Sequence, residues 1–404
     1  MEKPTKTLLT ALTDAVEVNQ KVVEELRSVN ASSALISVFV TAQTTAQEEK
    51  LRILNEIECK SPEKIKMTGY SITVASGQGS RAYHEDRLDI NIGLENPHLY
   101  AAVFDGHGGS CASKFGQEKL RSIVQKKLAS HPTDFVGISK CIDAAFKELH
   151  SEMFHVSAGW NMVNQQPRDG TTASMAYLTS TTVMLACVGD SPIYTVHRLH
   201  GKLQAAYGTR LHSIEGSKDI DNIVNRGGAI VCIDGRKVVT KKGSKGSINM
   251  TRSLGDFWMH PVLSQSPSIR AVELKNLAYL VLATDGCTLK PEQVAKVLED
   301  VEEEEKTTPG PINAAHTIIG TLNEMHSLDY ASHDNVTVIV IRLNVTVSQE
   351  NTKPKVSQVH LTPIFSKNDG IMVHVNGSRI TQVETEEVKS YKDFTQGINF
   401  VKYL

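Results

Sequence analysis

Four aspartates lie at the ends of strand-like segments, where a side chain can face a cleft. Asp105 and Asp285 each follow an apolar run and precede a glycine. Asp86 lies between two strand-like runs, and Asp334 immediately precedes another. Carboxylates brought together repel one another unless a positive charge lies between them. Hard divalent cations with oxygen ligands are the usual solution, so these aspartates predict a metal centre.

The chain between residues 67 and 343 alternates strand-like and helix-like segments that would position these aspartates. The strand-like runs are rich in Val, Ile, Leu and Ala, as expected of strands buried on both faces. They are 71–76, 88–93, 99–104, 182–189, 278–284 and 336–343. Helices are predicted over 110–129, 136–156, 216–226, 291–299 and 311–326. This texture predicts a mixed domain, but it does not decide between a parallel and an antiparallel arrangement of strands.

Two flanking segments differ in texture from this domain. In residues 1–66, apolar residues recur at three- and four-residue steps, which predicts a helical N-terminal extension. Residues 344–404 form a C-terminal tail, in which strand-like runs at 371–375 and 379–383 flank Asn376-Gly377 and predict a hairpin. Each extension is a candidate regulatory element that packs on the main domain or binds a protein partner.

The composition is that of a soluble globular protein. Of the 404 residues, 40% are hydrophobic and 22% are charged, and the formal net charge is -2. Without a basic excess, no nucleic-acid partner is expected. No apolar run reaches the roughly 18 residues that span a bilayer, and the N-terminus lacks a secretory or transit pattern, so no membrane partner is expected. The six cysteines lack CxxC pairing, and we expect a cytoplasmic protein, with the nucleus as a second location.

Eight short motifs between residues 70 and 343 occur in the order typical of one family. Each is weak alone, but the ordered set is specific. They are Arg81-x-x-x-Glu85-Asp86, Phe104-Asp105-Gly106-His107-Gly108-Gly109, Gly170-Thr171-Thr172-Ala173, Val188-Gly189-Asp190-Ser191, Gly227-Gly228, Thr251-Arg252-Ser253-Leu254-Gly255-Asp256, Ala283-Thr284-Asp285-Gly286 and Asp334-Asn335-Val336-Thr337-Val338. The chain thus resembles the metal-dependent protein serine/threonine phosphatases of type 2C.

The resemblance implies a fold and a set of metal ligands. The expected fold is α+β, a four-layer α-β-β-α sandwich of two antiparallel sheets flanked by helices. The expected cofactors are two Mn²⁺ or Mg²⁺ ions per subunit. By resemblance, Asp105 bridges both ions, the Gly106 carbonyl binds one, Asp285 and Asp334 bind the other, and Glu85 and Asp86 hold metal-bound waters.

The resemblance also assigns the residues that act on a phosphorylated protein substrate. Arg81 is expected to bind the phosphate, because a guanidinium donates to phosphate oxygens in a planar fork. His107 is expected to protonate the leaving oxygen. Two cations counter the charge of the phosphate and acidify a bridging water, so that no covalent enzyme intermediate is needed.

Several positions depart from the family pattern. Pro167 occupies the place where relatives carry an aspartate for a third ion, and Asp169 is shifted, so a third ion is left open. Pro192, Leu211 and Cys287 also replace common family residues. These departures leave a second interpretation, in which the chain is a weakly active or inactive phosphatase-like regulatory protein. A phosphohydrolase of small molecules is a third.

Two segments of the sequence are rich in charged residues of one sign, and no catalytic role is assigned to the first of them. The acidic run Glu302–Glu305 is interpreted as a solvated connector. The segment from Gly235 to Gly246 is rich in lysine and arginine, and it is either a solvated turn or a surface that recognises acidic phosphopeptides. Phosphopeptide kinetics with neutralised lysines would distinguish these two interpretations.

Overall fold

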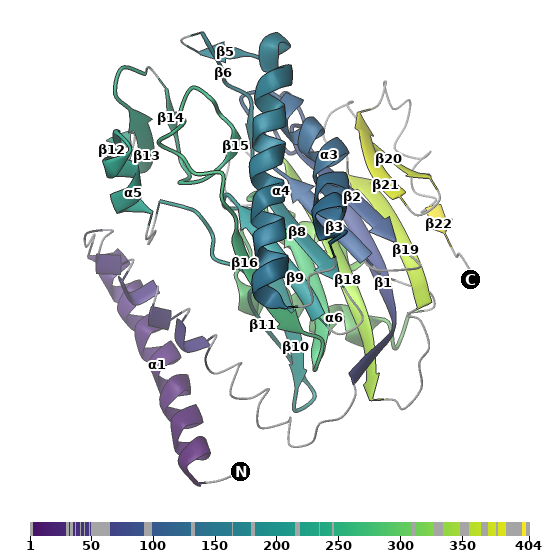
Figure 1. Cartoon of the computed structure of the whole chain (residues 1–404). Helices are drawn as coiled ribbons and strands as arrows, with labels where there is room; N and C mark the ends of the chain where they lie inside the picture. Colours follow the sequence, from purple (N-terminus) through teal and green to yellow (C-terminus); the bar gives the residue numbers. More distant parts are fainter. Residues whose placement is uncertain are drawn as a thin grey trace.

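Figure 1 shows the computed structural model of the chain, in which two packed sheets are flanked by helices. The structure describes 3–29, single positions and short runs between 32 and 49, 65–92, 99–130, 134–163, 165–178, 182–214, 219–233, 235–244, 246–308, 312–326, 334–347, 355–364, 371–376, 379–384 and 398–400. No helix within these ranges is long and apolar enough to cross a membrane.

The core of the fold is a pair of seven-stranded sheets. The first contains, in spatial order, β11 (Lys202–Tyr207), β10 (Ile193–Leu199), β17 (Leu277–Ala283), β18 (Val336–Val347), β1 (Ile65–Gly77), β19 (Lys355–Ile364) and β22 (Ile398–Phe400). The second contains β16 (Ser268–Glu273), β9 (Thr182–Val188), β8 (Ala173–Leu178), β3 (Leu99–Phe104), β2 (Arg87–Ile92), β21 (Arg379–Glu384) and β20 (Ile371–Asn376). Described neighbours in both sheets are antiparallel except β1 and β19, which are parallel.

Strand β3 shows why the sequence forms four layers. All six of its residues are buried. Alternate residues of a strand point to opposite faces, and here Leu99, Ala101 and Val103 pack between the two sheets. Tyr100 and Phe104 pack on the other face, beneath helices. A strand that is apolar on both faces needs a layer on each side, which explains the uninterrupted apolar run.

Helices cover the outer face of each sheet. Helices α3 (Cys111–Leu128) and α4 (Phe135–Val156) pack on the second sheet, and α6 (Pro291–Glu304) and α7 (Ala314–His326) pack on the first (Figure 1). The expected four-layer sandwich is therefore confirmed. The N-terminal extension contains α1 (Lys3–Ser28), which is helical as predicted.

Smaller elements surround one end of the sandwich. A side lobe joins the short helix α5 (Ile220–Asn225) to a three-stranded sheet of β12 (Gly228–Ile233), β13 (Arg236–Lys241) and β14 (Ser247–Ile248). A second small sheet contains β15 (Leu254–Gly255), β7 (Gly170–Thr171) and β4 (Gly106–His107). The remaining short elements are β5 (Met162–Val163), β6 (Gln166–Pro167) and the 3₁₀ helix η1 (Ser157–Gly159).

The lysine- and arginine-rich segment is part of this lobe rather than a simple turn. Strand β13 accounts for half of it, and Lys241 Nζ donates hydrogen bonds to the carbonyl oxygens of Trp258 and His260, at 3.1 and 2.6 Å. Lys241 is thus a structural tie, whereas Arg236 and Lys242 remain exposed. Lys245, a further cation of this segment, lies outside the described residues.

The C-terminal tail contributes strands to both sheets. Strands β20 and β21 pair antiparallel, with Asn376 opposite Arg379, which agrees with the predicted hairpin. Gly377, in the predicted turn, lies outside the described residues. Strand β21 pairs with β2 in one sheet, and β19 pairs with β1 in the other.

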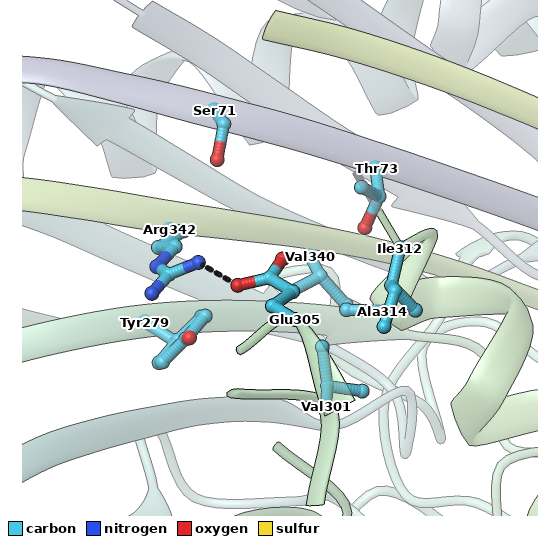
Figure 2. A pocket seen from close by; sticks show the side chains of 9 residues that line it. All are labelled: Ser71, Thr73, Tyr279, Val301, Glu305, Ile312, Ala314, Val340 and Arg342. Atoms are coloured by element: carbon cyan, nitrogen blue, oxygen red, sulfur yellow. Dashed lines mark hydrogen bonds and ion pairs between the residues drawn. The ribbon is translucent and has the colours of Figure 1, made fainter. Parts of the chain in front are cut away.

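The prediction that the acidic run Glu302–Glu305 is a solvated connector was wrong for Glu302 and Glu305, whereas Glu303 and Glu304 are exposed. Helix α6 continues through Glu304. Figure 2 shows Glu305 paired with Arg342 of β18, at 2.6 Å, beside a cavity of about 50 Å³. Glu302 accepts a hydrogen bond from the Tyr279 hydroxyl, at 2.6 Å, and pairs with Arg198. Basic and phenolic partners on the adjacent strands keep these glutamates at the helix–sheet interface, which the run of like charges by itself does not reveal.

Candidate active site

Asp105 and Asp285 meet where the two sheets come together. Asp105 follows β3 of one sheet, and Asp285 follows Thr284 at the end of β17 in the other. The Asp285 backbone N–H donates to Asp105 Oδ2 at 3.3 Å. Thr172 fixes the Asp105 backbone from both sides, because its hydroxyl accepts the Asp105 N–H and its own N–H donates to the Asp105 carbonyl. Two aspartates that are 180 positions apart are thereby in direct contact.

Asp86 is completely buried between β1 and β2, beside this pair. Its Oδ2 accepts a hydrogen bond from the Thr284 hydroxyl at 2.8 Å, and its Oδ1 has no partner among the described residues. Burial raises the pKa of Asp86 to about 7. Hydrogen bonds from hydroxyl groups oppose this increase, and the negative charges of Asp285 and Asp334 add to it. This carboxyl therefore lies among other carboxylates, with one oxygen unsatisfied.

Asp190 belongs to the same cluster, although the sequence motif that contains it suggested no role. It follows β9, is partly buried, and has a buried Oδ1 atom without a partner in the described part of the chain. Burial and the charge of Asp285 raise its pKa to about 7. The motif Val188-Gly189-Asp190-Ser191 was the only available signal, and it does not show which way the side chain points.

Burial and mutual repulsion raise the pKa values of the carboxylates in this cluster. Burial and the charges of Asp285, Asp86 and Asp190 raise the pKa of Asp105 well above its usual value. Burial also raises the pKa of Asp285. Raised pKa values and unpartnered buried oxygens are what oxygen ligands for hard cations show without a cation between them. The donor set therefore fits divalent ions, although no three acidic, histidine or cysteine side chains within the described ranges are already grouped closely enough to hold one.

Gly106 allows the loop that carries Glu85 to pack against the end of β3. A Cβ atom at Gly106 would lie 2.4 Å from the Glu85 carbonyl oxygen and 2.7 Å from Ser113 Oγ. Ser113 Oγ also donates to that carbonyl, at 2.6 Å. Burial raises the pKa of the Glu85 carboxyl, while a hydrogen bond from the Gly109 N–H opposes the increase. A side chain at Gly106 would displace Glu85 from the cluster.

Asp334 and Arg81 form the exposed side of the site. Arg81 Nη2 donates to Asp334 Oδ2 at 2.5 Å, and the side chains are 55% and 38% exposed. Asn335 fixes the loop that carries Arg81, because its Oδ1 accepts the Glu85 N–H and its Nδ2 donates to the carbonyl of Gln78. The sequence motif contained Asn335, but its role in holding the loop became visible only in the structure.

His107 is paired with a buried carboxylate that the sequence-based list of site residues did not include. Its Nε2 lies 2.7 Å from Asp256 Oδ2, and Trp258 Nε1 donates to the other oxygen of Asp256 at 3.2 Å. Burial lowers the pKa of His107, but Asp256 and more distant carboxylates outweigh it, so that the net pKa is raised. Gly170 makes room for the pair, since a Cβ there would lie 2.1 Å from Asp256 Oδ2.

The carboxylate of Asp169 accepts hydrogen bonds from backbone N–H groups. It is completely buried, and its two carboxylate oxygens accept the N–H groups of Cys111 and Asn161, each at 3.2 Å. Pro167, at the position where relatives place an aspartate, lies in β6. Neither residue offers a free carboxylate for a third ion.

The predicted site residues thus come from distant segments and meet at one end of the sandwich. Asp86, Asp105 and Asp285 are joined by hydrogen bonds through Thr284 and the Asp285 backbone, and Asp334 is joined to Arg81. The structure adds three residues to the predicted set: Asp190, Asp256 and Asn335.

Residues 70–336 match the protein phosphatase 2C family. The chain therefore belongs to this family, whose members are metal-dependent phosphatases. It is 26% identical over 287 residues to probable protein phosphatase 2C 11 of Arabidopsis thaliana, which covers 70% of this chain and 69% of that protein. It is 23% identical over 309 residues to protein phosphatase 1L of Bos taurus, which covers 73% of this chain and 79% of the relative.

Two solved structures support the fold assignment. Serine-threonine phosphatase 2C from Toxoplasma gondii superposes with a TM-score of 0.57 at 18% identity, and the match covers 68% of this chain and 94% of that one. A Caenorhabditis elegans sex determining protein gives a TM-score of 0.54 at 21% identity, covering 76% and 73%. At such identities the likeness concerns the fold alone.

Proposed function

We propose that this chain hydrolyses phosphoserine and phosphothreonine in proteins, with two Mn²⁺ or Mg²⁺ ions held at the aspartate cluster. The supporting observation is the contact between Asp285 and Asp105 across the two sheets, beside buried oxygens of Asp86 and Asp190 that lack partners. A buried group of carboxylates is unfavourable by itself and becomes favourable when cations are bound.

The carboxylates around Asp105 would hold the ions. The groups proposed as direct ligands are the carboxylates of Asp105, Asp285 and Asp334 and the carbonyl of Gly106, with Glu85 and Asp86 orienting bound water. When bound, the two ions would counter the charge of the phosphate and supply a hydroxide nucleophile near neutral pH. Because Asp169 already accepts two backbone N–H groups, we propose two ions rather than three.

Arg81 would bind the phosphate of the substrate. Its guanidinium is more than half exposed and now pairs with Asp334. An exposed ion pair contributes only about 0–1 kcal/mol, so Arg81 can exchange this partner for a phosphate at small cost. A planar guanidinium donates two parallel hydrogen bonds to phosphate oxygens, which orients the substrate as well as binding it.

His107 would donate the proton that the departing serine or threonine oxygen needs. Its side chain is 27% exposed, whereas that of Asp256 is 1% exposed, so substrate can reach the histidine but not the aspartate. Asp256 stabilises the imidazolium and fixes the orientation of the ring. Asp256 raises the pKa of His107, which favours the protonated form that a proton donor needs.

The decisive experiment is metal-dependent hydrolysis of a phosphothreonine peptide and of p-nitrophenyl phosphate. Wild-type protein should be active with Mn²⁺ and inactive with a chelator, and Asp105→Asn should lose at least about 100-fold in kcat/KM. Asp143→Asn is a matched control, because Asp143 pairs only with Lys147 on the surface of α4.

If the chain is instead an inactive regulatory protein, neither substrate should be hydrolysed. The pairing of Arg81 with Asp334 favours this alternative, as do the positions such as Pro192 and Cys287 that depart from the family pattern. A properly folded wild-type protein that hydrolyses neither substrate with Mn²⁺ or Mg²⁺ would refute the proposed activity. Hydrolysis of sugar phosphates or nucleotides in preference to phosphopeptides would instead indicate a small-molecule phosphohydrolase.

A further inference from the structure

Arg168 lies beside the loop that carries His107. It stands between β6 and β7, and β7 pairs with β4 so that Gly170 is opposite His107. This register brings Arg168 against the glycine that follows His107. A Cβ atom on Gly108 would lie 3.2 Å from both Cγ and Nε of Arg168. Gly108 has a φ of +72°, a conformation that favours glycine, and its missing side chain leaves room for the arginine stem.

The backbone around Arg168 is held from three directions. The Arg168 N–H donates to the Asn161 carbonyl at 2.7 Å, and the carbonyls of its neighbours Pro167 and Asp169 accept N–H groups from Trp258 and Asp256. A residue held in this way presents its side chain from a fixed point. The position is thus ordered before any substrate binds, which lowers the entropic cost of a contact made by the side chain.

The guanidinium of Arg168 has no partner in the described part of the chain. Neither a hydrogen bond nor an ion pair joins it to another described residue, although its side chain is exposed beside a strongly acidic site. Arg81, a second arginine near this site, is paired with Asp334. Adjacent residues alternate in direction, so Asp169 points inward to Cys111 and Asn161 while Arg168 points outward.

The side of the site on which Arg168 lies determines what it can contact. In the proposed reaction, His107 faces the leaving oxygen, and the leaving group is the protein chain of the substrate. A cation beside His107 is therefore near the substrate polypeptide, whereas Arg81 is placed for the phosphate. A guanidinium beside a polypeptide pairs best with a carboxylate, which it binds through two parallel hydrogen bonds.

We propose that Arg168 is a specificity residue that binds an acidic side chain next to the phosphorylated residue of the substrate. This proposal rests on the proposed phosphatase function and identifies a class of substrate for it, namely phosphoproteins with Asp or Glu near the phosphorylation site. The lysine- and arginine-rich lobe around β13 is another surface that could produce a preference for acidic substrates. Arg236 is chosen to test that lobe because its side chain is also exposed.

The test compares kcat/KM for matched phosphothreonine peptides that carry Asp, Asn or Lys at single positions on either side of the phosphothreonine. Wild-type protein should prefer Asp to Asn about fivefold at one or more positions, as expected for a charge pair at a partly exposed surface. In Arg168→Gln this ratio should fall to about one, and in Arg168→Glu the preference should shift to Lys. Arg168→Lys should retain part of the preference, and Arg236→Gln should leave it unchanged.

Hydrolysis of p-nitrophenyl phosphate separates this role from a role in the chemical step. That substrate has no peptide, so Arg168→Gln should hydrolyse it at the wild-type rate. Equal use of Asp and Asn peptides by the wild type, an unchanged ratio in Arg168→Gln, or a loss in Arg236→Gln instead would each overturn the proposal.

A binding measurement distinguishes failure of this proposal from failure of the proposed activity. If the wild type does not hydrolyse p-nitrophenyl phosphate, the phosphatase proposal fails. Fluorescence anisotropy of the same peptides with Asp105→Asn protein still measures the Asp-to-Asn preference, without any turnover. Equal affinities in that assay refute the role of Arg168, and a preference that Arg168→Gln removes supports it.

Discussion

Asp190→Asn should stabilise the metal-free protein, by an amount that depends on pH. Asp190 has a buried Oδ1 atom, and its pKa is raised from 3.8 to about 7, first by burial and then by the charge of Asp285. Below pH 3.8 the carboxyl is protonated in both the folded and the unfolded protein, so it does not lower the free energy of unfolding. As pH rises from 3.8 to about 7, only the unfolded state releases the proton, and the folded state loses about 1.4 kcal/mol per pH unit.

The full cost at pH 8 is about 4 kcal/mol, because the pKa values differ by roughly three units. At pH 5 the cost is smaller, on the order of 2 kcal/mol. Asparagine has nearly the same shape and does not titrate, so its own packing cost is the same at both values of pH. The stability difference between Asp190→Asn and wild type should therefore be larger at pH 8 than at pH 5, by roughly 2–3 kcal/mol.

The assay is chemical denaturation with a chelator present at pH 5 and pH 8, followed by circular dichroism. Asp143→Asn is the control, since an exposed pair of this kind should change stability by less than about 0.5 kcal/mol at either pH. A difference between Asp190→Asn and wild type that is the same at both values of pH would refute the reasoning. Excess Mn²⁺ should reduce the advantage of the variant at pH 8, because bound cations compensate the charge of the cluster in the wild type.

Three further predictions concern the His107–Asp256 pair and the helix–sheet interface. Asp256→Asn removes the charge that raises the pKa of His107, so the decline of kcat on phosphopeptides with rising pH should begin at lower pH; an unchanged pH profile would contradict this role. The same variant should affect p-nitrophenyl phosphate much less, because its leaving group does not need a proton. Gly170→Ala should lower kcat/KM at least about tenfold, since its Cβ would lie 2.1 Å from Asp256 Oδ2, and a fully active variant would show that the pair is not needed. Glu305→Gln should destabilise the protein by only about 0.5–1 kcal/mol in urea denaturation, because its partner Arg342 is 38% exposed; a loss above about 2 kcal/mol would mean that the pair is effectively buried.

The strands could largely be predicted because burial leaves a local record in the sequence, whereas the order of the layers came from the family resemblance. The run Leu99–Phe104 is apolar at every position, and it forms β3 with both faces covered. The direction of the strands left no such record. Antiparallel pairing within the sandwich came from the family resemblance, and the parallel pairing of β19 with β1 was not predicted.

Contacts between distant segments explain what sequence reasoning missed at the site. Asp256 reaches His107 across 149 positions, and Asn335 reaches Glu85 across 250. No periodicity or spacing connects such pairs, because each depends on how two separate loops are placed by the sandwich. The helical end at Glu302–Glu305 was missed for a similar reason, since its partner Arg342 comes from another strand.

The sequence by itself determined the chemical inventory of this protein: aspartates followed by glycine at strand ends, a histidine beside one of them, and the ordered motifs that connect it with the protein phosphatase 2C family. Those features are local, so the residue types and their neighbours reveal them. Only the tertiary structure decided which carboxylates lie together, which of their oxygens lack partners, and that the Arg168 guanidinium has no partner among the described residues. Charge, burial and hydrogen bonding depend on distances through space, and for Asp105 and Asp285 folding brings together residues that are 180 positions apart along the chain.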